Sequence, residues 1–198
     1  MIVVSLAMGA ALFAAPLLAD DAAGGECPTA DAAMMALPLE AFDQGDGGWR
    51  SLDQPGCELA AAEVIRLYRQ AHGAGVADWG GTLLWHEAQL RAAGGDTEEA
   101  IRLMVAGRAK DSPEIRPYTD ATIAFLRRDR AALLAARAEL VALPMPEQFA
   151  RAAARYAESY PSLPPLEWPL NLHVVDGLIS CFEKPYREAY GCDPETPE

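Results

Sequence analysis

From Glu58 onward, apolar residues recur at intervals of three and four along the chain. This spacing places them on one face of a helix, and Gly or Pro ends most of the runs. The pattern predicts an all-α fold. The expected helices cover 58–72, 82–93, 97–111, 118–127, 130–142 and 172–182, with another after Pro146 that Phe149, Ala152, Ala153, Tyr156 and Tyr160 would line.

The segment before Glu58 lacks such a period. A short helix over 32–37 would be capped by Asp31 and would end before Pro38. Several glycines then interrupt 38–57, and we expect a loop or a small extended excursion there, anchored by Trp49 and Leu52.

A second irregular segment, 161–171, contains four prolines and predicts a polyproline-like strap packed by Leu163, Leu166 and Trp168. We expect one domain over 20–198, which is long enough to bury a single core. Its parts would be an irregular leader over 20–57, helical hairpins over 58–143 and C-terminal helices with the strap over 144–198.

Residues 1–19 are uncharged, almost wholly apolar and end in small residues before Asp20. This pattern is typical of a secretory signal peptide that is cleaved after Ala19. The segment has no Lys or Arg near its start, which makes the start codon suspect. An uncleaved membrane anchor is the alternative, because about 20 apolar residues span a bilayer, but Gly9 and Pro16 lower its hydrophobicity. A lipoprotein fits less well, since Glu26 directly precedes Cys27. We expect cleavage, no stable membrane insertion afterwards, and a periplasmic or secreted location.

Four cysteines follow the predicted cleavage site, an even number that suits an oxidising compartment. Three pairings are possible, and we prefer Cys27 with Cys57 and Cys181 with Cys192. Each of these bridges would hold one end of the domain, and each loop of this size stabilises the fold by about 3 kcal/mol in the chain-entropy model. A metal site is the alternative, but the chain has no C-x-x-C motif, so we expect neither metal nor cofactor.

The formal net charge of −13 is spread along the chain without an acidic run. A surface of this charge favours solubility and opposes binding to nucleic acid or to an anionic membrane. We expect neither as a partner.

The segment LLWHEAQLRAAGGDTEEAIRLMVAGRAKDSP resembles a tetratricopeptide repeat, a pair of antiparallel helices joined by a short Gly-Asp turn. The positions that carry the resemblance are Ala88, Gly95, Asp96, Ala100, Met104 and Gly107. Small residues at a helix crossing let two helix axes approach closely, so a bulky residue at Ala88 or Ala100 should force the pair apart.

The next helix pair repeats this outline with fewer matching positions. Leu134 stands where the small Ala100 equivalent belongs, and no Pro closes the unit. The resemblance covers roughly 80–143 and implies stacked antiparallel helical hairpins with irregular, disulfide-stapled ends. It also implies binding of a peptide or protein in a concave groove. The groove positions Gln89, Arg91 and His86 match no known peptide-clamp set, so no binding residue is transferred.

The histidines and their neighbours are the candidates for chemistry. His86-Glu87 resembles the beginning of a zinc-protease motif, but Leu90 stands where the second His is required. We expect His72 to interact with the carbonyls at the end of its own helix. His173 and Asp176 lie three apart on the last predicted helix and could hydrogen-bond. No serine elbow, phosphate loop or cysteine nucleophile accompanies them.

Aromatic residues could stack sugars or peptides if they share a cleft, although packing in the core is the simpler interpretation. They are Trp49, Trp79, Trp85, Trp168, Tyr118, Tyr156, Tyr160, Tyr186 and Tyr190. The locally basic group Arg127, Arg128, Arg130 and Arg137 is typical of the solvated face of a helix pair.

Three functional hypotheses follow. The first is an exported module of the periplasm or envelope that binds a protein or peptide partner. The second is a small-ligand binder or hydrolase-type enzyme with a pocket between the hairpins and the strap, lined by His173, Asp176 and His86. The third is a purely structural secreted domain. The sequence favours the first hypothesis, leaves enzymatic activity open and favours its absence.

Overall fold

The structure is a computed structural model that describes residues 26–73 and 81–193. These residues form helices and no strand, so the fold is all-α. The helices are α1 (Ala32–Met35), α2 (Leu39–Gln44), the 3-10 helix η1 (Trp49–Leu52), α3 (Glu58–His72), α4 (Thr82–Ala93), α5 (Thr97–Arg108), α6 (Arg116–Leu126), α7 (Arg130–Val141), α8 (Glu147–Ser159), α9 (Leu172–Ser180) and α10 (Tyr186–Tyr190). The predicted signal peptide, 1–19, lies outside the described residues.

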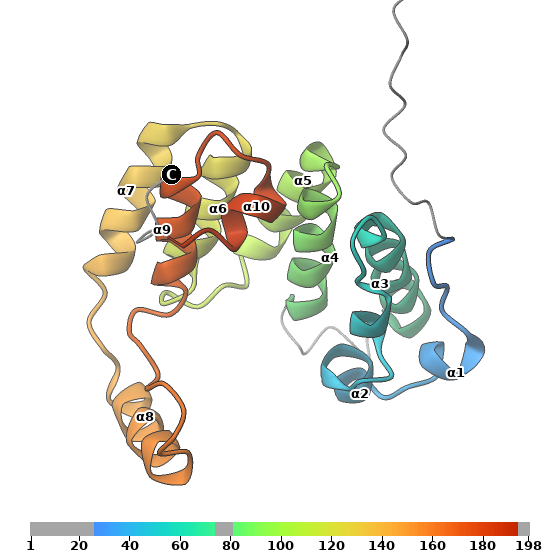
Figure 1. Ribbon diagram of the computed structural model, residues 1–198, viewed down its shortest axis with the longest axis horizontal. Helices are drawn as coiled ribbons and strands as arrows, with labels where there is room; N and C mark the ends of the chain where they lie inside the picture. Colours follow the sequence, from blue (N-terminus) through green and yellow to red (C-terminus); the bar gives the residue numbers. More distant parts are fainter. Residues whose placement is uncertain (1–25, 74–80, 194–198) are drawn as a thin grey trace, which may run out of the picture.

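Helices α3 to α7 pack in chain order, each against the next (Figure 1). Short turns produce this arrangement. Gly95, with a φ of +88°, occupies the turn between α4 and α5, a conformation that glycine adopts without steric cost. Between α6 and α7, Asp129 caps the new helix by accepting a hydrogen bond from the Ala132 amide at 2.9 Å. Helix α9 returns to pack on α6 and α7, and α10 contacts both α9 and α4.

Two apolar cores lie along this row of helices. The larger is built from α4 to α7 with α9 and α10, and Phe125, Leu133 and Leu178 are fully buried in it. The smaller joins the N-terminal segment to α3 and α4. Its centre is Phe42, whose ring stacks on that of Tyr68 with the centroids 3.7 Å apart. The N-terminal segment is therefore packed against the helical row.

The prediction of an irregular excursion over 38–57 was wrong in part, because this segment contains α2 and η1. Both elements are too short for their apolar period to be recognised in the sequence. Pro38 precedes α2 without interrupting it, and Gly48 lies too close to the Phe42 carbonyl to accommodate a Cβ. Trp49 and Leu52 are buried, as expected of the anchors of this segment.

The strap over 161–171 also differs from expectation. Leu163 and Leu166 are exposed, and Trp168 is the residue that packs. The Trp168 indole donates a hydrogen bond to the Leu143 carbonyl at 3.1 Å, and its ring lies 5.0 Å from that of Phe149. The strap thus folds back on α8, and the two project together from the row of helices (Figure 1). No residue of α8 is buried.

Two disulfides join Cys27 to Cys57 and Cys181 to Cys192, the pairing that the sequence analysis preferred. The first ties the leader to the start of α3, and the second ties the end of α9 to the segment just after α10. Helix α9 ends at Ser180, two residues earlier than predicted, and the short α10 was not predicted. Within the described residues, no helix is long and apolar enough to cross a membrane.

Candidate functional site

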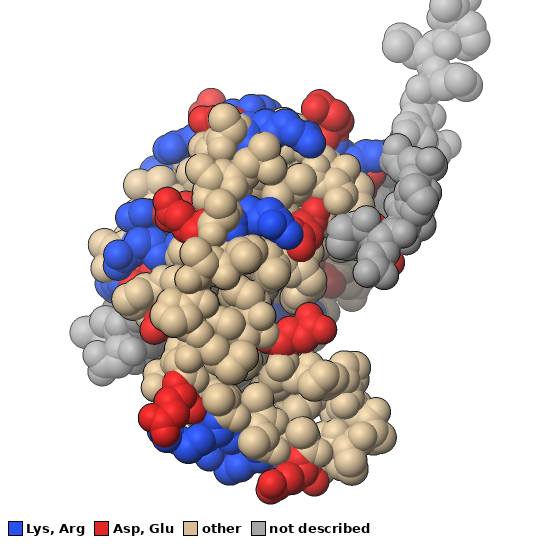
Figure 2. Space-filling model, turned by 90° about the vertical axis from the view of Figure 1, so that its left-hand side faces the viewer, with Lys and Arg blue, Asp and Glu red and all other residues tan. Residues whose placement is uncertain are grey.

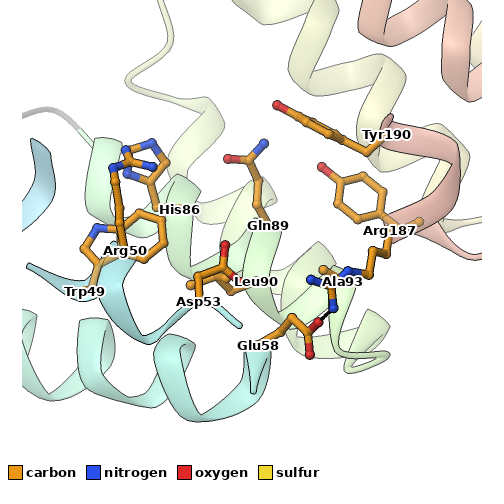
Figure 3. Close-up of a pocket in the computed structure, with 11 residues that line it drawn as sticks. Trp49, Arg50, Asp53, Glu58, His86, Gln89, Leu90, Ala93, Arg187 and Tyr190 are labelled. Atoms are coloured by element: carbon orange, nitrogen blue, oxygen red, sulfur yellow. Dashed lines mark ion pairs between the residues drawn. The ribbon is translucent and has the colours of Figure 1, made fainter. Parts of the chain in front are cut away.

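A cavity of about 370 Å³ lies between η1, α4 and α10 (Figure 3). Eleven residues line it: Trp49, Arg50, Asp53, Glu58, His86, Gln89, Leu90, Ala93, Tyr186, Arg187 and Tyr190. They come from three segments that lie far apart in the sequence. The site therefore exists only once the N-terminal segment and α10 have both packed against α4.

Helical spacing explains which residues each element contributes. On α4, His86, Gln89 and Ala93 are separated by three and four positions, so they share the face that lines the cavity. On α10, Tyr186 and Tyr190 are four positions apart and likewise share a face. Figure 3 shows His86 toward one end of the cavity, Tyr190 toward the other and Gln89 between them.

His86 is held by a buried carboxylate. Its Nδ1 lies 2.7 Å from Oδ1 of Asp43, and Asp43 is completely buried. Burial on its own would raise the pKa of Asp43, but hydrogen bonds from His86 and Trp49 outweigh this effect and lower the pKa to about 2. Because an ionised carboxylate can only accept hydrogen bonds, Nδ1 carries a proton and donates a hydrogen bond to Asp43. Nε2 is left as the second polar atom of the ring.

The same carboxylate organises the 3-10 helix beside it. The Trp49 indole donates to Asp43 at 2.9 Å, and Arg50 Nε donates to the Asp43 carbonyl at 2.8 Å. The Arg50 guanidinium lies 4.4 Å from the centroid of the Trp49 ring, a cation-π distance. Asp43 thereby fixes His86, Trp49 and Arg50 at this end of the cavity.

Tyr186 is buried in the opposite wall. Burial raises the pKa of its hydroxyl, which makes no hydrogen bond of normal geometry and has the Gln89 carboxamide as its polar neighbour. A buried hydroxyl without a well-formed hydrogen bond costs about 1–3 kcal/mol. A ligand that completed this hydrogen bonding would recover part of that free energy.

An ion pair between Arg187 and the nearly buried Glu58 closes the cavity at the end nearest Tyr190 (Figure 3). Glu58 also accepts a hydrogen bond from the Gly56 amide at 3.1 Å. This ion pair joins α10 to the first turn of α3.

A carboxylate that orients an imidazole is an arrangement used in acid-base catalysis. The eleven lining residues include neither Ser nor Cys, so they supply no nucleophile of the serine or cysteine type. In the part of the chain that the structure describes, no cluster of three or more His, Cys, Asp or Glu residues could hold a metal ion.

The structure separates the predicted site residues. His86 lines the cavity, whereas His173 is exposed and Asp176 accepts hydrogen bonds from Arg137. The expected contact between His173 and Asp176 is not formed, and neither residue lines the cavity of His86. A shared pocket of all three residues beside the strap is thus not formed.

Two further expectations need correction. His72 Nε2 lies 2.9 Å from the Met35 carbonyl, so it bonds to the N-terminal segment and not to the end of its own helix. Arg128 donates to the carbonyls of Phe182 and Lys184, so it holds the C-terminal segment in place. Arg137 likewise donates to Asp176. Arg128 and Arg137 therefore hold packed segments together and do not simply form a solvated face.

Asp43 and Gln89 are functional candidates that the sequence analysis did not single out as such, and Tyr186 was named only among the aromatic residues that could stack a ligand. Asp43 lay in a segment expected to be irregular, and α10 was not predicted. Gln89 was considered as a groove position, together with Arg91. Arg91 instead pairs with Glu87 at 3.1 Å and with Asp96 at 3.0 Å, within the α4–α5 hairpin.

Comparison of the chain with protein-family models, with curated proteins and with solved structures finds no match.

Proposed function

We propose that this protein is an exported interaction module that binds a protein partner through a projecting arm, here called the finger. The finger comprises residues 145–170, which include α8 and the strap. One observation carries the proposal: the finger exposes a set of large apolar side chains, each between 38% and 54% accessible. They are Met145, Tyr160, Leu163, Leu166 and Leu170.

Exposed apolar side chains that occur singly are ordinary, but a contiguous group on one projection is typical of an interaction surface. In Figure 2 the finger extends below the body, with charged side chains along its left and lower edges and uncharged surface to the right of them. Glu147 and Arg151, four positions apart on α8, pair with each other at the exposed surface. An apolar centre with a polar rim is the usual anatomy of a protein interface.

The charge of the chain favours a partner other than a second copy. Two copies would each have a net charge of −13 and would repel each other. We infer a partner with an apolar contact surface and a net positive charge, because opposite charges accelerate association.

We further propose that α4 to α7 form two stacked hairpins of the tetratricopeptide type, which serve as the rigid support of the finger. Ala88 and Ala100 are fully buried, as close packing of α4 on α5 requires. Gly107 faces a Leu84 methyl group that a Cβ would approach to 3.3 Å. A rigid support holds the apolar side chains in place before the partner arrives and so reduces the entropy lost on binding.

Export through a cleaved signal peptide is the third part of the proposal. Two disulfides support an oxidising location, because such bonds persist outside the cytosol. Intact-mass measurement of the protein recovered from the periplasm, with and without reduction and alkylation, tests this. Cleavage after Ala19 and no free thiols before reduction are expected, and four free thiols would contradict export.

Site-specific photo-crosslinking tests the interaction. A photoreactive amino acid at Leu163, which is 52% exposed, should capture one basic protein that mass spectrometry identifies. The matched control is Leu59 on α3, which is 45% exposed and lies outside the finger. A yield at Leu163 no greater than at Leu59 would contradict the proposal.

The captured protein is then purified and its affinity for paired variants is measured. Leu163→Ser with Leu166→Ser should weaken binding roughly tenfold or more, because apolar anchors carry most of an interface's free energy. Leu59→Ser with Leu67→Ser, a similarly exposed pair on α3, should change it less than about twofold. Equal affinities of the two double variants would contradict the proposal, as would a dimer by light scattering that the finger variant converts to a monomer.

A further inference from the structure

We propose that the cavity between η1, α4 and α10 binds a neutral, hydroxyl-rich small molecule, of the size and chemistry of a mono- or disaccharide. The cavity and the finger share no residue, so this proposal stands independently of the proposed protein partner.

The charges of the lining favour a neutral ligand. Arg50 and Arg187 contribute two positive charges, and Asp53 and Glu58 contribute two negative charges. Arg187 and Glu58 already neutralise each other as an ion pair. An anion attracted by Arg50 would be repelled by Asp53. A cation attracted by Asp53 would be repelled by Arg50. Neither sign of ligand charge is favoured.

The polar groups of the lining suit hydroxyl groups, each of which both donates and accepts hydrogen bonds. Arg50 donates, Asp53 accepts, and the Gln89 carboxamide does both. His86 is held by Asp43 through Nδ1, which leaves its Nε2 as a further polar atom for a ligand. Tyr186, whose buried hydroxyl lacks a well-formed hydrogen bond, lies beside Gln89. The lining therefore contains both donors and acceptors, as recognition of several hydroxyls requires.

Aromatic rings stand at both ends of the cavity. Trp49 lies beside His86, with their ring centroids 5.4 Å apart, and Tyr190 lies beside Tyr186, at 5.6 Å. Tyr190 is 39% exposed, so its ring is accessible to a ligand. An aromatic face offers an apolar surface for the C–H groups of a sugar ring, while the polar groups take the hydroxyls.

The volume agrees with a ligand of this class. Small-molecule pockets measure about 300–1,000 Å³, and this cavity of about 370 Å³ is near the lower limit. One or two sugar rings fit this size, whereas a longer oligosaccharide would extend beyond it. Six of the eleven lining residues have charged, imidazole or amide side chains, which disfavours a lipid or a steroid-like ligand.

Saturation-transfer NMR and calorimetry with a defined set of sugars test the proposal. The probes are glucose, N-acetylglucosamine, maltose and cellobiose, with glucuronate as the anionic and glucosamine as the cationic counterpart. At least one neutral sugar should bind, and more tightly than both charged sugars. Absence of binding by all four neutral probes, or a preference for a charged counterpart, would overturn the proposal.

Variants then locate the binding. Tyr190→Ala and Gln89→Leu should each weaken binding roughly tenfold, because each removes a ligand contact, whereas Tyr190→Phe should retain most of it, since the ring remains. The matched controls are Tyr160→Ala and Gln148→Leu, which change exposed residues of the finger. His86→Ala is avoided because it also disturbs Asp43. Equal binding by the cavity variants and their controls would place the sugar elsewhere and overturn the proposal, provided that circular dichroism shows all variants folded.

Discussion

His86 Nδ1 donates a hydrogen bond to Asp43 across 2.7 Å, although the two residues are 43 positions apart in the sequence. This contact fastens α2 to α4, and the Trp49 indole binds the same carboxylate. One buried charge therefore helps to hold the N-terminal segment against the helical row, beside the apolar core around Phe42. One wall of the cavity depends on the same charge.

Asp43→Asn should lower the free energy of unfolding by about 2–4 kcal/mol, because charge-assisted hydrogen bonds to two buried donors are lost or weakened. Urea denaturation followed by circular dichroism measures the change. Asp46→Asn, an exposed position in the same segment, should alter the stability by less than about 0.5 kcal/mol. Equal stabilities of the two variants would show that the buried carboxylate does not hold this segment.

The stability should also depend on pH through Asp43. Its pKa is about 2 in the folded protein against 3.8 ordinarily, so the ionised form favours folding. The resulting contribution, about 2 kcal/mol, is complete above about pH 5 and is lost as the pH falls from about 4 to about 2. Comparing the wild type with Asp43→Asn over this range isolates the effect from other carboxylates. If the difference in stability between the two proteins did not change with pH, the proposed contribution of the ionised Asp43 would be contradicted.

Gly177→Ala should destabilise the packing of the C-terminal segment on α9. A Cβ at Gly177 would lie 2.6 Å from the Cys192 carbonyl oxygen and 3.1 Å from that of Ala189, both backbone atoms. Relieving this overlap should cost about 1–3 kcal/mol. Gly191→Ala is the matched control, because nothing lies within 4 Å of its added Cβ. Thermal melts distinguish the two, and a control that melts as low as Gly177→Ala would refute this account.

Removing the Cys181–Cys192 bridge by paired Ser substitutions should cost about 3 kcal/mol, the loop-closure value for a separation of 11 residues. Because α10 lies inside this loop, its amides should lose hydrogen-exchange protection before those of α6. The double variant Cys27→Ser with Cys57→Ser is the comparison, since it should expose the leader and leave α10 protected. Loss of protection at α10 in both variants would contradict the expectation that the Cys181–Cys192 bridge specifically holds α10.

Ala100→Leu should force α5 away from α4, because Ala100 is fully buried between packed helices. A loss of about 1–3 kcal/mol is expected in urea denaturation. Ala106→Leu, at an exposed position on the same helix, should be nearly neutral. If Ala100→Leu were equally neutral, the close packing of this hairpin would not depend on a small residue.

The helical part of the fold could be read from the sequence, because the apolar period and its Gly and Pro interruptions are local signals. The predicted boundaries of the helices at 58–72 and 82–93 agree with α3 and α4. The preferred disulfide pairing also agrees with the structure, since short loops at each end leave few good alternatives. Shorter elements were missed: α2, η1 and α10 contain too few residues to show a period.

The candidate site was largely hidden from the sequence. His86 was identified as a candidate, but His173 and Asp176, which were expected to share its pocket, lie elsewhere. The residue that contacts His86 is Asp43. A hydrogen bond between residues 43 positions apart has no signature in either local segment. The exposed leucines of the strap were likewise expected to pack, because their apolar character does not say whether a surface is available to cover them.

The sequence by itself determined the all-α class, the main helices and the positions of the cysteines, since these follow from local backbone preferences and from the spacing of side chains. Tertiary structure alone decided that η1, α4 and α10 enclose a cavity, that Asp43 orients His86, and that the finger stands apart from the core. These features depend on which surfaces meet after the helices form. That choice rests on the packing of the whole chain, and no segment of the sequence contains it.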